Sequence, residues 1–176
     1  AYCEDLKSID FGKTLEVVQG KDSYFGKPGA FQGCKSLEKL FFPASFRFMS
    51  SGAFYDCDSL ISIKVDETNE HYDSREDCNA VINRETNSLV LGCSTTVIPE
   101  SVTEIEDSAF GHCKGLTEMT LHEGITIVGT QVFRYCEGLK SAAVLGPVKD
   151  LGYAFYGCKA LETVTFGAGI KKMDED

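Results

Sequence analysis

Residues 109–116 read AFGHCKGL, and nearly the same phrase recurs along the chain. It returns as AFQGCKSL (30–37), AFYDCDSL (53–60), VFRYCEGL (132–139) and AFYGCKAL (154–161). In each copy a cysteine follows the phenylalanine by three residues, and a leucine follows the cysteine by three more. A phrase that recurs at a regular spacing indicates a repeat protein, in which short units stack on one another.

Alignment on the cysteine gives six units, because a partial unit with Leu6 and Ile9 precedes the five full ones. The unit cysteines are Cys3, Cys34, Cys57, Cys113, Cys136 and Cys158. Their separations are 31, 23, 56, 23 and 22 residues, which indicates a basal period near 23. The separation of 56 contains a large insertion at about 66–100.

Each unit continues past its leucine as L-x-x-Φ-x-Φ, where Φ is apolar. Examples are LISIKV (60–65), LTEMTL (116–121) and LETVTF (161–166). The last three residues alternate in the manner of a half-buried strand. A polar turn and a second, weaker apolar stretch then lead to the next phenylalanine. We therefore predict a strand, a turn, a second extended piece and a bend in every unit.

A unit of this length cannot bury its apolar side alone, but a stack of units can form a continuous core. Three columns of buried side chains are predicted. The first is Phe31, Phe54, Phe110, Phe133 and Phe155. The second is Leu37, Leu60, Leu116, Leu139 and Leu161. The third is Leu40, Ile63, Met119, Ala142 and Val164.

Cysteine is a small, readily buried side chain with a weak S–H donor, so we expect the unit cysteines to be free, buried thiols. Cys78 and Cys93 lie outside the repeat register, in DCNAVINRETNSLVLGC (77–93). This segment is typical of a β-hairpin whose turn is NRETN (83–87). Two alternatives stay open for Cys78 and Cys93: a cross-strand disulfide, or two buried thiols side by side.

The charge of the chain is strongly acidic, with 27 Asp and Glu against 17 Lys and Arg and a formal net charge of −10. A nucleic-acid partner is not expected, because binding one requires a basic face that neutralises phosphates. Membrane insertion is not expected either, because no apolar run approaches the roughly 18 residues of a spanning helix. We expect any export signal to lie outside this sequence.

No pattern in the chain predicts catalysis or a bound metal. His71, His112 and His122 form no H-E-x-x-H motif. His112 directly precedes Cys113, but the other units have glycine, aspartate or tyrosine at that position, which argues against a catalytic Cys–His pair. The acidic stretch VDETNEHYDSRED (65–77) lacks the residue order of an EF-hand loop. We expect no catalytic residue, no metal site and no cofactor.

The phrase A-F-x-x-C-x-x-L-x-x-Φ resembles the BspA-like leucine-rich repeat, also called the Treponema pallidum type. The stretch 77–110 is similar to the form found in Bacteroides surface proteins. The resemblance covers essentially the whole chain and implies one leucine-rich-repeat domain over residues 1–176. It implies a repeat solenoid, a right-handed stack of mainly short parallel β-strands with short helical or irregular bends, plus the inserted hairpin.

The resemblance also implies a function. It implies a non-enzymatic protein-binding module at the cell surface or secreted, which acts as an adhesin toward host extracellular-matrix proteins or other bacterial surface proteins. The alternative is a passive spacer that projects another domain from the cell surface, and a hydrolase is a third, weaker hypothesis. We expect a monomer. Neither end resembles a polar cap, so we also expect a fragment of a longer array.

The strand column is the best candidate for a binding face, because strands in a solenoid line one extended surface. Its outward-pointing residues are predicted to be Asp10, Phe41, Lys64, Thr120, Ala143 and Thr165. Phe41 is a large aromatic residue, and exposed aromatics are frequent interface anchors. The alternative is that Phe41 packs against the enlarged loop of the first interval, at Tyr24 or Phe25.

Overall fold

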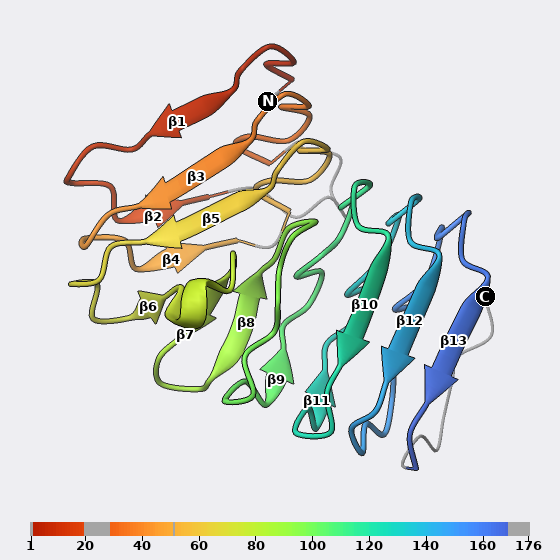
Figure 1. Ribbon diagram of the computed structural model, residues 1–176. Coiled ribbons are helices and arrows are strands. Elements are labelled where there is room, and N and C mark those ends of the chain that lie inside the picture. The colour runs from red at the N-terminus through yellow and green to blue at the C-terminus, as the bar shows by residue number, and fades with distance from the viewer. Residues whose placement is uncertain (1, 20–28, 51, 169–176) are drawn as a thin grey trace.

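The computed structural model describes residues 2–19, 29–50 and 52–168. Within these ranges the backbone passes repeatedly between two rows of short strands, through turns and bends (Figure 1). The single helical element of the described residues is the three-residue 3-10 turn η2 (Arg75–Asp77). The predicted bends are therefore irregular turns.

The first row consists of two parallel three-stranded sheets. One sheet contains β1 (Ser8–Asp10), β3 (Lys39–Phe42) and β5 (Ser62–Val65), and the other contains β10 (Glu118–Leu121), β12 (Ser141–Val144) and β13 (Thr163–Phe166). Equivalent residues of successive units are paired, so that Leu40 lies opposite Ile63 and Met119 opposite Ala142. This register keeps each apolar column on one face of its sheet.

The second row consists of the weaker apolar stretches and the insertion. β2 (Val17–Val18) pairs with β4 (Phe48–Met49), and a five-stranded sheet has the order β11 (Ile127–Val128), β9 (Glu104–Ile105), β8 (Ser88–Leu91), β7 (Val81–Asn83), β6 (Tyr72–Asp73). β7 and β8 pair antiparallel and form the hairpin, whereas β8 pairs parallel with β9. The inserted hairpin thus extends the second row.

The insertion interrupts the first row. β5 and β10 do not pair with each other, and residues 93–98 lie between them without forming a strand. Thr95 Oγ1 donates a hydrogen bond of 2.6 Å to the carbonyl of Ile61, just before β5. Figure 1 shows the consequence, with β1–β3–β5 at one end of the stack and β10–β12–β13 at the other.

The predicted phenylalanine column is confirmed within each half of the stack. Ring centroids are 5.3 Å apart for Phe31 and Phe54, 5.4 Å for Phe110 and Phe133, and 5.5 Å for Phe133 and Phe155. The leucine and third columns are confirmed as well, since their inner members are buried and Leu161 and Val164 pack against the core.

The phenylalanine stack is broken between Phe54 and Phe110, where Gly92 takes the place of a phenylalanine. The Gly92 N–H donates to the Ala109 carbonyl at 2.9 Å, the bond that a phenylalanine N–H makes elsewhere in the stack. A side chain cannot replace glycine here, because a Cβ would lie 2.1 Å from Phe110 Cε1. The buried residues accordingly form two clusters, one on each side of this break.

Left-handed backbone conformations shape every bend. The residue before each unit cysteine has a positive φ, and these residues are Tyr2 (62°), Gly33 (76°), Asp56 (57°), His112 (62°), Tyr135 (56°) and Gly157 (74°). The residue four positions earlier also has a positive φ in every full unit except the first. These residues are Gly52, Ser108, Gln131 and Tyr153. Residues other than glycine adopt it at a cost of roughly 1–2 kcal/mol, so the surrounding contacts must maintain it.

The unit cysteines connect neighbouring coils through their thiols. Three of the thiols donate to the phenylalanine carbonyl of the preceding coil: Cys57 to Phe31 (3.4 Å), Cys136 to Phe110 (3.0 Å) and Cys158 to Phe133 (3.1 Å). The same carbonyls accept the N–H of their own unit's cysteine, at 3.3, 3.0 and 3.0 Å. Cysteine therefore fills the bend and supplies a second donor there.

None of the eight cysteines, all of which lie in the described residues, forms a disulfide. The antiparallel ladder of the hairpin ends at Val81 opposite Leu91, where a bulge shifts the register. Cys78 packs in the C-terminal core cluster and Cys93 in the N-terminal one. Both of these thiols are buried and unpaired, and each lies near its own backbone carbonyl acceptor, Ala80 for Cys78 and Asn79 for Cys93.

We predict that Phe133→Ala lowers the free energy of unfolding by about 3–5 kcal/mol, because it removes a fully buried ring that stacks on both sides. Phe41→Ala is the matched control, since Phe41 is 49% exposed and its truncation should cost much less. Urea unfolding followed by circular dichroism measures both values. Equal losses would contradict the column as the main source of stability.

We also predict that Cys136→Ala costs about 0.5–1.5 kcal/mol for the lost thiol hydrogen bond, plus a smaller contribution from the space left by the sulfur. The exposed Cys3→Ala should leave stability unchanged. An unfolding midpoint of Cys136→Ala equal to that of the parent protein would show that the thiol bond contributes nothing.

Candidate functional site: a groove on the C-terminal sheet

The structure separates the six predicted binding residues into two rows of three. Asp10, Phe41 and Lys64 lie side by side across β1, β3 and β5. Thr120, Ala143 and Thr165 lie side by side across β10, β12 and β13. The two rows belong to different sheets, so the predicted residues do not form one continuous ladder.

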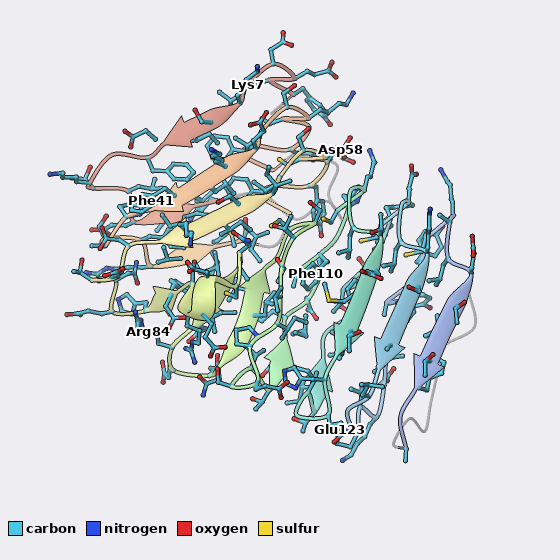
Figure 2. The ribbon with its side chains drawn as sticks, in the orientation of Figure 1. Lys7, Phe41, Asp58, Arg84, Phe110 and Glu123 are labelled. Carbon is cyan, nitrogen blue, oxygen red and sulfur yellow. The ribbon has the colours of Figure 1, made fainter. Side chains whose placement is uncertain are left out.

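In the N-terminal row, an exposed phenylalanine ring lies beside a lysine that already forms an ion pair. Phe41 is 49% exposed on the outer face of β3, where Figure 2 labels it. The Lys64 ammonium next to it forms an ion pair with Asp77 at the end of η2. The loop partners predicted for Phe41, Tyr24 and Phe25, lie outside the described residues.

The C-terminal row lies in a groove of about 540 Å³. The outer faces of β10, β12 and β13 form its floor, and residues 96–100 form a wall at its β10 side. The floor residues are Glu118, Met119, Thr120, His122, Ser141, Ala142, Ala143, Thr163 and Thr165, and the wall residues are Thr96, Val97, Ile98 and Glu100. All three predicted residues of this row therefore line the groove.

Hydrogen bonds hold the wall in place. Thr96 Oγ1 donates to the Asn79 carbonyl at 2.7 Å and accepts the Cys93 N–H at 2.8 Å. The Val97 N–H donates to the Cys78 carbonyl at 3.1 Å. Ile98 is buried beneath the wall, whereas the Val97 side chain is 73% exposed at its rim. No local pattern in the sequence predicts this wall, because its position depends on backbone contacts with the inserted hairpin.

His122 ties the wall to the end of β10. The Gly124 N–H donates to His122 Nδ1 at 3.1 Å, so the proton of the ring is on Nε2. Nε2 in turn donates to the Pro99 carbonyl at 3.0 Å. Both nitrogens of the imidazole are used by the backbone in this arrangement. It is a structural residue of the groove and not a free base.

The groove is chemically suited to binding. Its lining contains hydroxyl groups, two carboxylates, one exposed valine and, in the centre, the small side chain of Ala143. No cysteine or lysine lines it, and its one imidazole is already engaged.

Among the residues that the structure describes, no group of His, Cys, Asp and Glu has the arrangement of a metal site. No helix in the same residues is long and apolar enough to cross a membrane.

A cluster of charged side chains joins the two halves of the stack. His112 Nδ1 lies 3.0 Å from Asp56 Oδ1, and Lys114 Nζ lies 3.2 Å from the same oxygen. Gln32 Nε2 donates to Asp56 Oδ2 at 3.3 Å. The ring of His112 stacks on that of Tyr55 at a centroid distance of 4.5 Å. The hydrogen bond from His112 is the largest cause that lowers the pKa of Asp56 well below its usual range, and the charge of His112 and the hydrogen bonds from Lys114 and Gln32 add to it.

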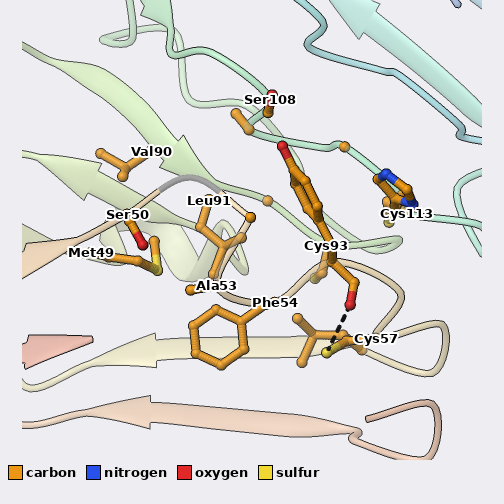
Figure 3. Close-up of a pocket in the computed structure, with 17 residues that line it drawn as sticks. Met49, Ser50, Ala53, Phe54, Cys57, Val90, Leu91, Cys93, Ser108 and Cys113 are labelled. Carbon is orange, nitrogen blue, oxygen red and sulfur yellow. Dashed lines mark hydrogen bonds between the residues drawn. The ribbon is translucent and has the colours of Figure 1, made fainter. Parts of the chain in front are cut away.

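This cluster is structural. A cavity of about 30 Å³ lies behind it at the break in the phenylalanine stack, lined by Phe54, Gly92 and Cys113 among others (Figure 3). Burial raises the pKa of Cys113 to about 12, so the thiol next to His112 stays protonated and is a poor nucleophile. The sequence had one signal for the contact between Asp56 and His112, since both directly precede a unit cysteine.

The sequence matches the BspA type leucine rich repeat region in six copies, over residues 1–76 and 81–176. The chain belongs to the BspA type leucine-rich repeat family. The repeats of this family account for the short strands and the near absence of helices among the described residues. A search of curated proteins found no match.

Solved structures share the fold of this BspA type chain. The pneumococcal vaccine antigen PcpA has a TM-score of 0.57 at 19% identity over 88% of the chain. A leucine rich cell surface protein from Faecalibacterium prausnitzii has a TM-score of 0.51 at 18% identity over 94%. A leucine-rich repeat protein from Eubacterium ventriosum has a TM-score of 0.51 at 20% identity over 73%. The chain spans 43%, 61% and 42% of those proteins, respectively.

We predict that Asp56→Asn lowers the free energy of unfolding by about 1–3 kcal/mol at neutral pH, because a charged hydrogen-bond network loses its acceptor. The lowered pKa means that this contribution is present above the ordinary carboxyl pKa of about 4 and is lost as pH falls through the folded value. The difference between the parent and the variant should therefore shrink in acid.

Urea unfolding at about pH 7 and about pH 3 measures this change. The exposed Asp5→Asn is the control, because it removes the same charge outside the cluster. A stability difference that stayed constant over this pH range would show that the carboxylate of Asp56 is not the stabilising species.

Proposed function

We propose that the chain is a non-enzymatic protein-binding module of the cell surface, with an adhesin-type interaction toward host matrix proteins or other bacterial surface proteins. The groove on β10, β12 and β13 is the observation that carries this proposal. Family membership and the cell-surface description of the F. prausnitzii relative support it. Binding needs no group beyond those that line the groove.

The shape of the groove favours a macromolecular ligand. Interfaces combine an apolar contact with a rim of polar groups that pair with the partner. Here Val97 provides exposed apolar surface, and Thr120, Ser141 and Thr163 provide hydroxyls on a floor of short side chains. A passive spacer would need neither a hydrogen-bonded wall nor an open floor, which is why we place the spacer second.

The remaining parts of the proposal concern the whole molecule. We propose that the repeats wind right-handed with a unit near the cysteine separations of 23 and 22 residues, and that residues 1–176 act as one monomeric domain. We further propose that this domain is part of a longer array. Phe41 and Lys64 then form a second candidate contact on the same side of the stack.

We predict that Ala143→Tyr abolishes or weakens binding at least about tenfold, because the larger side chain fills the centre of the groove. Stability should change by no more than about 0.5 kcal/mol, since Ala143 is only half-buried. The assay is binding of the immobilised protein to a panel of matrix proteins, mucins and glycans.

Ser62→Tyr is the matched control, because Ser62 lies on the outer face of β5 in the N-terminal sheet. Phe41→Ser with Lys64→Glu tests the N-terminal row in the same assay. Saturable protein binding that survives Ala143→Tyr but is lost in the second variant would move the site to the N-terminal row. Absence of saturable binding to every protein in the panel would favour the spacer.

A further inference from the structure

The charges in the groove all have one sign. Glu100 on the wall and Glu118 on β10 both line it, and no lysine or arginine does. Among the described residues, neither carboxylate has a lysine or arginine partner within ion-pair distance. The side chain of Glu100 is 89% exposed, so its charge faces the solvent that a ligand would displace.

The imidazole of the groove does not offset these charges. His122 Nδ1 lies 3.5 Å from Glu100 Oε2, but Nδ1 already accepts the Gly124 N–H and has no proton to donate to the carboxylate. Lys140 and Glu162 are exposed and directly precede β12 and β13, and neither lines the groove. The groove therefore keeps the charge of its two carboxylates.

The apolar part of the groove has a defined place. Val97 is 73% exposed on the wall, next to Glu100, and the floor opposite is widened by Ala143. No aromatic side chain lines the groove, so a sugar ring would find no flat face to stack on. Carboxylates repel phosphate and sulfate groups, which excludes nucleic acids and sulfated glycans as good ligands. An apolar contact beside carboxylates suits a peptide that has both apolar and basic side chains.

This inference rests on the proposed function, that the groove binds protein. We propose that the ligand is an extended polypeptide segment in which lysine or arginine side chains alternate with apolar ones. The basic side chains pair with Glu100 and Glu118, and an apolar side chain covers Val97. The backbone of the segment lies over Ala143, where hydroxyls of Thr120 and Thr165 are available as hydrogen-bond partners.

The test uses the intact chain and a labelled peptide of alternating lysine and valine, with peptides of alternating glutamate and valine or serine and valine as controls. Fluorescence anisotropy should show saturable binding of the lysine peptide alone. Affinity should fall when ionic strength rises from about 0.01 to about 1 M, because the Debye length shrinks from about 30 to about 3 Å.

Glu100→Gln with Glu118→Gln should weaken binding of the lysine peptide about threefold to tenfold, since two exposed ion pairs are lost. The matched control is Glu67→Gln with Glu70→Gln, two exposed carboxylates of the N-terminal half, which makes the same change in net charge. Ala143→Tyr should abolish binding of this peptide as well.

The outcomes separate this inference from the proposed function. Equal weakening by the two glutamine pairs would overturn the inference, because the attraction would then come from the net charge of the chain. Binding of a matrix protein that is lost in Ala143→Tyr but unaffected by salt and by the groove glutamines would also overturn it, while the proposed function stands. Groove-dependent binding of a neutral glycan without binding of the lysine peptide would overturn the peptide as ligand.

Discussion

The stack depends on one repeated bend, at which the phenylalanine ring of each unit packs on that of the next within each half of the stack. At this bend the residue before each unit cysteine is in the left-handed region, and the thiols of Cys57, Cys136 and Cys158 donate to the phenylalanine carbonyl one coil earlier. The phenylalanine rings lie one behind another at the same place, so a single bend sets the spacing of the coils and the core packing together. Strand pairing and the leucine columns follow from this spacing.

The insertion is the place where that regularity ends. Gly92 replaces a phenylalanine, so the ring stack stops, and a small cavity lined by Phe54 and Gly92 lies at this break. At this break, polar contacts join the two halves of the stack, because Asp56 forms ion pairs with His112 and Lys114. The inserted chain also omits a first-row strand and instead supplies the wall at residues 96–100. The groove thus arises where one repeat departs from the pattern of the others.

The charged cluster around Asp56 and the groove differ in the partners of their carboxylates. Where the two halves of the stack meet, the carboxylate of Asp56 is paired and half-buried, and its pKa is lowered. The neighbouring thiol of Cys113 is protonated. In the groove no lysine or arginine of the described residues lies within ion-pair distance of Glu100 or Glu118, and Val97 is exposed on the same wall as Glu100. Carboxylates without a basic side-chain partner of this kind are available to a ligand, which is why we place the proposed binding surface in the groove.

The sequence by itself determined the repeat, the buried columns, the strand positions and the outward direction of Thr120, Ala143 and Thr165, because each of these depends on contacts between equivalent positions of adjacent units. It also carried a signal for the bends, since glycine stands before Cys34 and Cys158. Only the tertiary structure decided that the six predicted residues lie on two sheets, that Asp56 meets His112, and that residues 96–100 wall a groove. These features depend on where an irregular insertion lies against distant coils, and no local periodicity encodes that position.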